Sequence, residues 1–347
     1  MHTNQGRSAT CTAALLVWAL LGTVPVAAQD SKLAATDEPI VRINIYPGSI
    51  INLPIWVMED QGFCAARHIK CEAVGIPGAP VALQALVAGS LEVNFLATDV
   101  AMQSVSRGNR VKIIALEAPN NIFTLNVRRD VAMPHLKDGY PAVMQDFKGL
   151  RISVTGRGAA TEVMTRALLL GAGVPEDSVT FVVGAPATAY PMMVEKQIDA
   201  AMMIEPFTTI CKIMSVCVTA VSLPNGQGPP DLRALNGAFL VFLATDDFIA
   251  AHTNTVESFV QAMSDAVAWT KTPANFERVL EIAKTHMTLG NVANPDALLN
   301  ELVKGEVPSL GIHVDRKAVG AFSDFLMKYK MIDNPVSVRT IVWDHAP

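Results

Sequence analysis

The segment 155–161 (Thr-Gly-Arg-Gly-Ala-Ala-Thr) carries the clearest pattern of ligand-binding residues in the chain. It joins a predicted strand, 150–154, to a predicted helix, and its glycines allow backbone N–H groups at the helix start to point inward. The helix macrodipole favours an anion there, and Arg157 could clamp a carboxylate or sulfonate with two hydrogen bonds. The alternative is a solvent-facing arginine on an ordinary strand-to-helix turn. The candidate ligand-binding residues of this segment are Thr155, Arg157, Gly158, Ala159 and Thr161.

Further candidates lie where other predicted strands end. In open α/β sheets, ligands bind beyond the carboxyl ends of the strands. Tyr46 could stack on a ligand or hydrogen-bond to it, or it could only cover the edge of the core. Asp99 and Glu205 could accept hydrogen bonds from a ligand amine, although Asp99 is equally suited to cap a helix. The full set at the strand ends is Tyr46, Ser49, Thr98, Asp99, Glu117 and Glu205.

Four cysteines form two close pairs in the sequence, Cys64 with Cys71 and Cys211 with Cys217. In an oxidising compartment, an even count with local spacing predicts two short-loop disulfides. His68 lies between the first pair and allows a metal-site reading, but the spacing matches no common zinc pattern and a fourth ligand is missing nearby. We therefore expect two disulfides and no bound metal.

The sequence contains no recognisable catalytic motif. It has no Gly-x-Ser-x-Gly elbow, no His-Glu-x-x-His, and no phosphate loop ending in Gly-Lys-Ser or Gly-Lys-Thr. We therefore expect a binding protein without a cofactor, and not an enzyme.

The composition bounds the size of the core and the kind of partner. Half of the 347 residues are hydrophobic and only 17% are charged, so the chain can bury a core large enough for two lobes or one large domain. The formal net charge is −5. Because phosphate binding needs a clustered excess of Lys and Arg, and no basic stripe is visible, nucleic acid is not an expected partner.

The N-terminal segment has the features of an export signal. Arg7 is the only fixed charge before the apolar run 13–24, and Val26-Ala27-Ala28 supplies the small residues that a signal peptidase requires. The run is short for a permanent membrane helix, which is the alternative. We therefore expect a signal peptide at 1–28 that is cleaved, and a mature protein in the periplasm.

A local pattern occurs twice along the chain and predicts the fold class. Gly-Ala-Pro at 78–80 and again at 184–186 is followed by an apolar helical stretch and then by a buried strand that ends in polar residues. Alternating strands and helices predict an α/β fold with doubly wound sheets. The segments 122–127 and 238–244 are interpreted as strands that cross over and return. The other strands are expected at 41–46, 69–74, 111–116, 150–154, 179–183 and 217–221, with one more in each copy of the repeat.

Four segments carry a resemblance to a known family: LPIWVMEDQGF (53–63), ALVAGSLEV (85–93), DFKGLRISV (146–154) and IDAA (198–201). In this order, the chain resembles periplasmic solute-binding proteins of the nitrate, sulfonate and taurine type, a group that includes binders of pyrimidine precursors. The resemblance implies a two-lobe, periplasmic-binding-protein-like (type II) fold in which each lobe is a doubly wound mixed sheet. Lobe 1 would comprise 39–119 and 238–347, with a C-terminal helical part, and lobe 2 would comprise 120–237.

The resemblance also implies a function. The protein would capture a small-molecule solute, in particular an anionic organic solute such as a sulfonate or carboxylate, by hinge closure. It would act as a monomer and deliver the solute to the membrane permease of an ABC importer, with 117–122 and 223–237 absorbing the rotation. The alternatives are a binder of a pyrimidine or thiamine precursor, a pyrimidine-synthase-like enzyme on the same fold, and a protein that presents its ligand to a membrane sensor.

Overall fold

The computed structural model describes residues 38–347. The predicted signal peptide, 1–28, therefore lies outside the described residues. Within 38–347, no helix combines the length and the apolar character that a membrane crossing requires.

Strands form where Val, Ile and other apolar residues run together between turn residues. Every predicted strand is present in the structure, with ends that differ by a few residues from those expected. The strands are β1 (Ile40–Ile45), β2 (Lys70–Gly75), β3 (Asn94–Ala97), β4 (Val111–Ala118), β5 (Thr124–Arg128), β6 (Arg151–Val154), β7 (Thr180–Val183), β8 (Ala200–Met203), β9 (Cys217–Ser222) and β10 (Leu240–Thr245).

Helices follow most of these strands, and several begin with a proline in the first turn, where the missing N–H is not needed. The helices are α1 (Leu53–Asp60), α2 (Ala79–Val87), α3 (Thr98–Ser106), α4 (Ala160–Gly171), α5 (Ala189–Val194), α6 (Phe207–Ile213), α7 (Asp246–Ala251), α8 (Thr253–Thr270), α9 (Phe276–His286), α10 (Pro295–Glu306), α11 (Arg316–Lys328) and α12 (Val338–Ile341). A short 3-10 helix, η1 (Ile50–Asn52), precedes α1.

The fold is a mixed α/β fold, as predicted, and its sheets combine parallel and antiparallel pairs. One sheet has the strand order β7-β6-β8-β5-β9, in which β5 is antiparallel to both neighbours. Another has the order β3-β10-β4, in which β10 is antiparallel to both neighbours. The two antiparallel strands follow the two places where the chain passes from one group of strands to the other, as expected of strands that cross over and return.

The strands at the N-terminal end form two sheets where one was expected. β1 pairs in parallel with β2 in a sheet of their own, and β3 belongs to the sheet with β10 and β4. The Asn44 side chain explains the break, because it accepts from the Phe95 N–H at 2.6 Å and donates to the Phe95 carbonyl at 3.0 Å. A buried amide thus replaces the backbone ladder between β1 and β3. Only one isolated parallel bridge, Ile43 to Val93, joins these segments in the described range.

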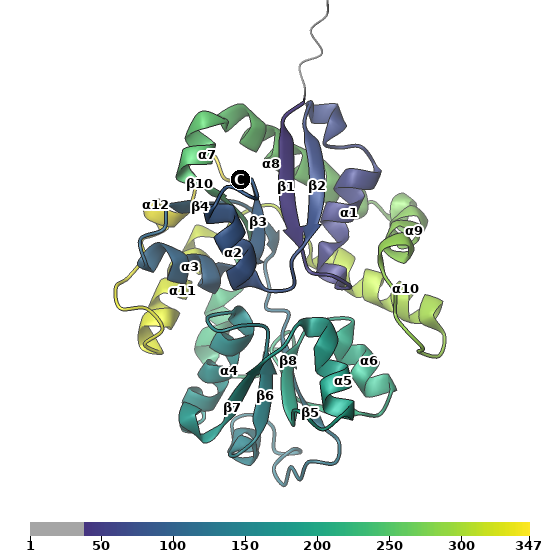
Figure 1. The fold of residues 1–347 in the computed structure, drawn as a ribbon, viewed down its shortest axis with the longest axis vertical. Coiled ribbons are helices and arrows are strands. Elements are labelled where there is room, and N and C mark those ends of the chain that lie inside the picture. The colour runs from purple at the N-terminus through teal and green to yellow at the C-terminus, as the bar shows by residue number, and fades with distance from the viewer. Residues whose placement is uncertain (1–37) are drawn as a thin grey trace, which may run out of the picture. The chain divides into compact units, whose positions relative to one another are not determined.

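Elements from the two ends of the described range pack together. α1 packs against α8 and α9, α11 packs against α3, and α12 packs against β4. Figure 1 shows the purple and blue elements β1–β4 among the green and yellow elements α7–α12, while the teal elements β5–β8 and α4–α6 lie together. The C-terminal helices therefore cover the N-terminal strands, as the family resemblance implied.

Both predicted cysteine pairs are joined as disulfides. Cys64, just beyond α1, is bonded to Cys71 in β2. Cys211 in α6 is bonded to Cys217 at the start of β9. The second bond lies in a small separate core with Met193 and Met203, whereas most buried apolar side chains belong to one large cluster. Each disulfide fixes the end of a helix to the strand that follows it.

Candidate ligand-binding site

A cavity of about 50 Å³ lies between the N-terminal strands and the segment around β6 and β8. Tyr46, Ala79 and Ala97 line it from one side, and Thr155, Thr161 and Met202 line it from the other. No charged side chain lines this cavity. Its walls therefore offer apolar surface, hydroxyl groups and backbone to a small ligand. We refer to it as the central cavity.

Three helices begin at the central cavity. Its lining includes the first residues of α2 and α4, Ala79 and Ala160, and the residue before α3, Ala97. None of these helix starts has a hydrogen bond from the side chain of its N-cap residue. The first N–H groups of a helix have no partner within it and carry the positive end of the macrodipole. At α3 the first N–H, that of Thr98, already donates to the Phe239 carbonyl. The starts of α2 and α4 therefore suit an acceptor group or an anion without any arginine or lysine.

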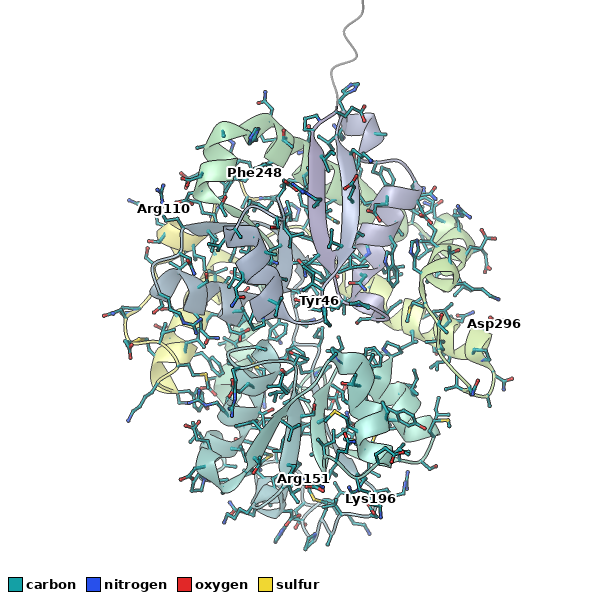
Figure 2. The ribbon with its side chains drawn as sticks, in the orientation of Figure 1. Tyr46, Arg110, Arg151, Lys196, Phe248 and Asp296 are labelled. Carbon is teal, nitrogen blue, oxygen red and sulfur yellow. A yellow bond between two sulfur atoms is a disulfide. The ribbon has the colours of Figure 1, made fainter. Side chains whose placement is uncertain are left out.

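Tyr46 is held in place by hydrogen bonds at both ends. Its hydroxyl donates to the Phe95 carbonyl at 2.8 Å, and its backbone N–H donates to Asn52 Oδ1 at 2.9 Å. Its ring meets that of Phe95 edge to face, and burial raises the pKa of the hydroxyl. Figure 2 shows Tyr46 at the boundary between the purple and blue elements and the teal elements. It can offer a ring face and a hydroxyl oxygen to a ligand.

Thr155 and Thr161 form a hydroxyl pair at the start of α4. Thr161 Oγ1 accepts from the Thr155 N–H at 2.9 Å and lies 3.0 Å from Thr155 Oγ1. Both residues line the central cavity. The pair and Tyr46 are the sequence-predicted site residues that the structure brings together here.

The rest of the segment 155–161 is engaged by the protein's own carboxylate. Glu162 in the first turn of α4 accepts from Arg157 Nη1 and from the Gly158 N–H, each at 2.6 Å. The guanidinium also lies over the Phe181 ring, and the Arg157 side chain is 66% exposed. The structure therefore does not bring Arg157 and Gly158 to the central cavity. Ala159 is the buried residue before α4.

Thr98, Asp99 and Glu117 are fully buried and do not line the central cavity. The Thr98 hydroxyl donates to the Ala238 carbonyl. Burial raises the pKa of Asp99 to about 7, although the nearby N–H groups at the start of α3 oppose this shift. Burial also raises the pKa of Glu117, and the charge of Glu306 raises it further. Within residues 38–347, no hydrogen-bond partner reaches the carboxyl oxygens of either Asp99 or Glu117.

Ser49 and Glu205 form a direct hydrogen bond between the segment after β1 and the segment after β8. Ser49 Oγ donates to the Glu205 carbonyl at 3.0 Å, and Glu205 Oε2 accepts from the Thr209 N–H at 3.2 Å. The Glu205 side chain faces a second cavity of about 420 Å³, which shares Ile51 and Ile122 with the central cavity. Glu205 thus lies beside the central cavity and not in it.

Sequence reasoning missed two residues of this region. Glu162 could have been found from its position in the first helical turn, where a carboxylate reaches back to the preceding backbone. Glu306, at the end of α10, also lines the second cavity. No local signal marks it, because its neighbours come from distant parts of the chain. No group of three His, Cys, Asp or Glu side chains in 38–347 is arranged to hold a metal ion.

Comparison with known proteins agrees with this architecture. The alkanesulfonate-binding protein SsuA from Xanthomonas axonopodis pv. citri, bound to MOPS, is 17% identical over 89% of this chain and 99% of its own, with a TM-score of 0.71. The aliphatic sulphonate binding protein SsuA from Escherichia coli is 15% identical over 89% and 98%, with a TM-score of 0.65. The nitrate-binding protein NrtA from Synechocystis PCC 6803 is 14% identical over 74% and 69%, with a TM-score of 0.58.

These likenesses show a shared periplasmic-binding-protein fold. A search among curated proteins found no significant match. The sequence profile of the NMT1-like family, in contrast, matches residues 49–284, which is more than half of the chain. The chain therefore belongs to the NMT1-like family.

Proposed function

We propose that the protein is the extracytoplasmic solute-binding component of an ABC-type import system. The observation that carries the proposal is the central cavity, which is lined from both groups of elements and contains the starts of three helices. Membership of the NMT1-like family supports it, as does the fold shared with proteins named for binding sulfonates and nitrate. In this function the signal peptide 1–28 is removed, the mature monomer works in the periplasm, and a membrane permease receives the solute.

The capture mechanism is closure of two lobes over the solute. Lobe 1 consists of 39–119 and 238–347, and lobe 2 consists of 120–237. The chain crosses between them after β4 and again after β9, so 117–122 and 223–237 absorb the rotation. A solute that contacts both lobes stabilises the closed form, because it binds that form more tightly than the open form.

The solute is a small organic acid, a sulfonate or a carboxylate. Its acid group accepts hydrogen bonds from the N–H groups at the starts of α2 and α4, where the helix macrodipoles favour negative charge. The Thr155 and Thr161 hydroxyls and the Tyr46 ring complete the contacts from the two lobes. No covalent bond forms between the protein and the solute in this proposal. The protein therefore binds the solute and does not transform it.

A thermal-shift screen of the mature protein, unfolded and refolded to remove carried-over ligand, tests the proposal. The compounds are sulfonates, carboxylates, nitrate, bicarbonate and pyrimidines. A micromolar binder at millimolar concentration should stabilise the fold by about 4 kcal/mol, which gives a clear rise in Tm. Binding should weaken in Thr161→Val and should persist in Arg157→Ala, because Arg157 lies outside the cavity. A Tm that no compound raises would contradict the proposed function.

A further inference from the structure

The second cavity, called here the acidic cavity, is lined by carboxylates from both proposed lobes. Glu205 reaches it from the end of β8, and Glu306 reaches it from the end of α10. No lysine or arginine is among its lining residues. A third carboxylate, Glu301, is compensated by Lys304 at 3.1 Å and is largely exposed. Glu205 and Glu306 therefore present carboxyl groups to the cavity without a basic partner among its lining residues.

Two of the carboxyl groups in this region have buried oxygens without a hydrogen-bond partner. Within 38–347, Glu306 Oε1 is inaccessible to solvent and has no hydrogen-bond partner. Glu117, which is 0% exposed, has no partner at either carboxyl oxygen. Burial raises the pKa of Glu117, and the charge of Glu306 raises it further. The charge of Glu205 in turn helps to raise the pKa of Glu306 to about 7, after the effect of burial.

Buried carboxyl groups without partners are unfavourable, since desolvation is not repaid by hydrogen bonds. A cationic nitrogen with N–H donors in the cavity would pair with Glu306 and Glu205, which line it, and would offset the repulsion among the carboxyl groups. The cavity also has apolar walls, from Ile50 and Ile51 of η1 and from Leu298 and Leu302 of α10. These walls suit the alkyl stem that carries such a nitrogen.

We infer that the captured solute carries an ammonium or guanidinium group on an alkyl stem, and that Glu306 and Glu205 bind this group in the acidic cavity. The inference rests on the proposed function, because it places the cationic end of the same solute. The central cavity and the acidic cavity share Ile51 and Ile122, so they are adjacent. In this inference one molecule extends from one cavity into the other. The acid group lies at the helix starts and the cationic group lies at the glutamates.

Isothermal titration with matched pairs of compounds tests the inference. Each pair consists of an ω-amino carboxylate and the straight-chain carboxylate of the same length, so that the two differ in the amino group alone. The wild-type protein should bind the amino compound of the best pair at least tenfold more tightly. Glu306→Gln should weaken binding of the amino compound about tenfold and leave that of the carboxylate within about twofold, because it removes a charge-assisted contact. Glu205→Gln should act in the same direction.

The matched control is Glu281→Gln on α9, an exposed glutamate paired with Arg278 outside both cavities, which should leave all affinities unchanged. Circular dichroism melting of each variant shows that it is folded. The inference is overturned if the carboxylates bind the wild type as tightly as the amino compounds, or if neither glutamine variant changes the preference. In either case binding itself would still support the proposed function. Failure of every compound to bind would contradict the proposed function together with the inference.

Discussion

Glu162 engages with its own carboxylate the two groups of the preceding loop, the Arg157 guanidinium and the Gly158 N–H, that the sequence suggested for an external anion. It accepts from the Gly158 N–H and from Arg157. Gly158 adopts a left-handed conformation, with φ of +73°, which is accessible to glycine at little cost. Arg157 and Gly158 are therefore already paired within the protein. The hydroxyl pair of Thr155 and Thr161 and the start of α4 are left to meet the solute.

Replacing Glu162 should affect stability and not solute affinity. Glu162→Gln removes the negative charge of the group that accepts two hydrogen bonds. We expect the free energy of unfolding to fall by about 1–2 kcal/mol. Arg157→Ala should cost below about 1 kcal/mol, because the side chain is largely exposed. Urea denaturation measures both, with exposed Glu195→Gln as the control. A tenfold loss of solute affinity in Arg157→Ala would instead place the guanidinium in the binding site.

Asp99 should make stability depend on pH. Its folded pKa of about 7 lies above the ordinary value of 3.8, so ionisation is harder in the folded state than in the unfolded state. The stability of the wild type should therefore fall as pH rises from about 4 to about 7, by a few kcal/mol in order of magnitude. Asp99→Asn removes this pH-dependent loss of stability, because asparagine does not ionise. The difference in free energy of unfolding between Asp99→Asn and wild type should grow in favour of the variant from pH 4 to pH 7.

Urea denaturation at pH 5 and pH 8 measures this difference. The same substitution at the exposed Asp324 on α11 is the control for a change of charge without burial. A difference between Asp99→Asn and wild type that is the same at both pH values would mean that Asp99 is not ionised with difficulty in the folded protein.

The elements could be predicted closely from the sequence, and the contacts between them could not. Strands rich in Val and Ile, bounded by turn residues, give a strong local signal, and the close spacing of the cysteines indicated both pairs. The break between β1 and β3 depends on the Asn44 side chain reaching Phe95, about fifty residues away in the chain. Likewise, the charge of Glu306 acts on the pKa of Glu117 although the two residues lie far apart in the sequence. Such contacts between distant segments leave no local pattern.

The candidate site shows the same limit. The rule that ligands lie at strand ends led to Tyr46, Thr155 and Thr161, which do line the central cavity. The same rule also selected Thr98 and Glu117, whose side chains point into the interior. A strand end fixes where the backbone lies, but not which way each side chain points. The direction of a side chain at the end of β3 or β4 depends on spatial neighbours that are distant in the sequence.

The first disulfide, which closes the connection between α1 and β2, should contribute measurably to the free energy of unfolding. Cys64 and Cys71 close a loop with a sequence separation of 7. For a loop of this size, the reduction in unfolded-state entropy corresponds to about 2 kcal/mol. We expect Cys64→Ala/Cys71→Ala to lower the free energy of unfolding, measured by urea denaturation, by about that amount. The slope of the folded-state signal against urea concentration should not change. Reductant also opens the Cys211–Cys217 bond, so it should lower the stability of the wild type at least as much as the two substitutions do. Equal stability of the variant and the untreated wild type would show that the first bond contributes nothing.

At the scale of the whole described chain, two hydrogen bonds join the proposed lobes outside the crossover segments 117–122 and 223–237. Ser49 Oγ donates to the Glu205 carbonyl at 3.0 Å, and Gln103 Nε2 donates to the Gly158 carbonyl at 3.1 Å. The Gln103 bond lies outside the central cavity, beside Arg107 and α2. It can therefore favour the closed form without touching the solute.

This separation allows closure to be tested apart from solute contact. Gln103→Ala removes a bond that exists only when the lobes are together, and a bond of this kind contributes about 0.5–1.5 kcal/mol. Because solute affinity is proportional to the fraction of protein that can close, the Kd should rise by up to about tenfold. X-ray scattering should show a larger radius of gyration for the variant without solute, and saturating solute should bring it to the value of the closed wild type. Gln84→Ala, at an exposed position of α2, is the matched control and should change neither quantity. A wild-type radius that does not decrease on saturation would show that the solute is captured without closure, and the Gln103 bond would then have no reason to affect affinity.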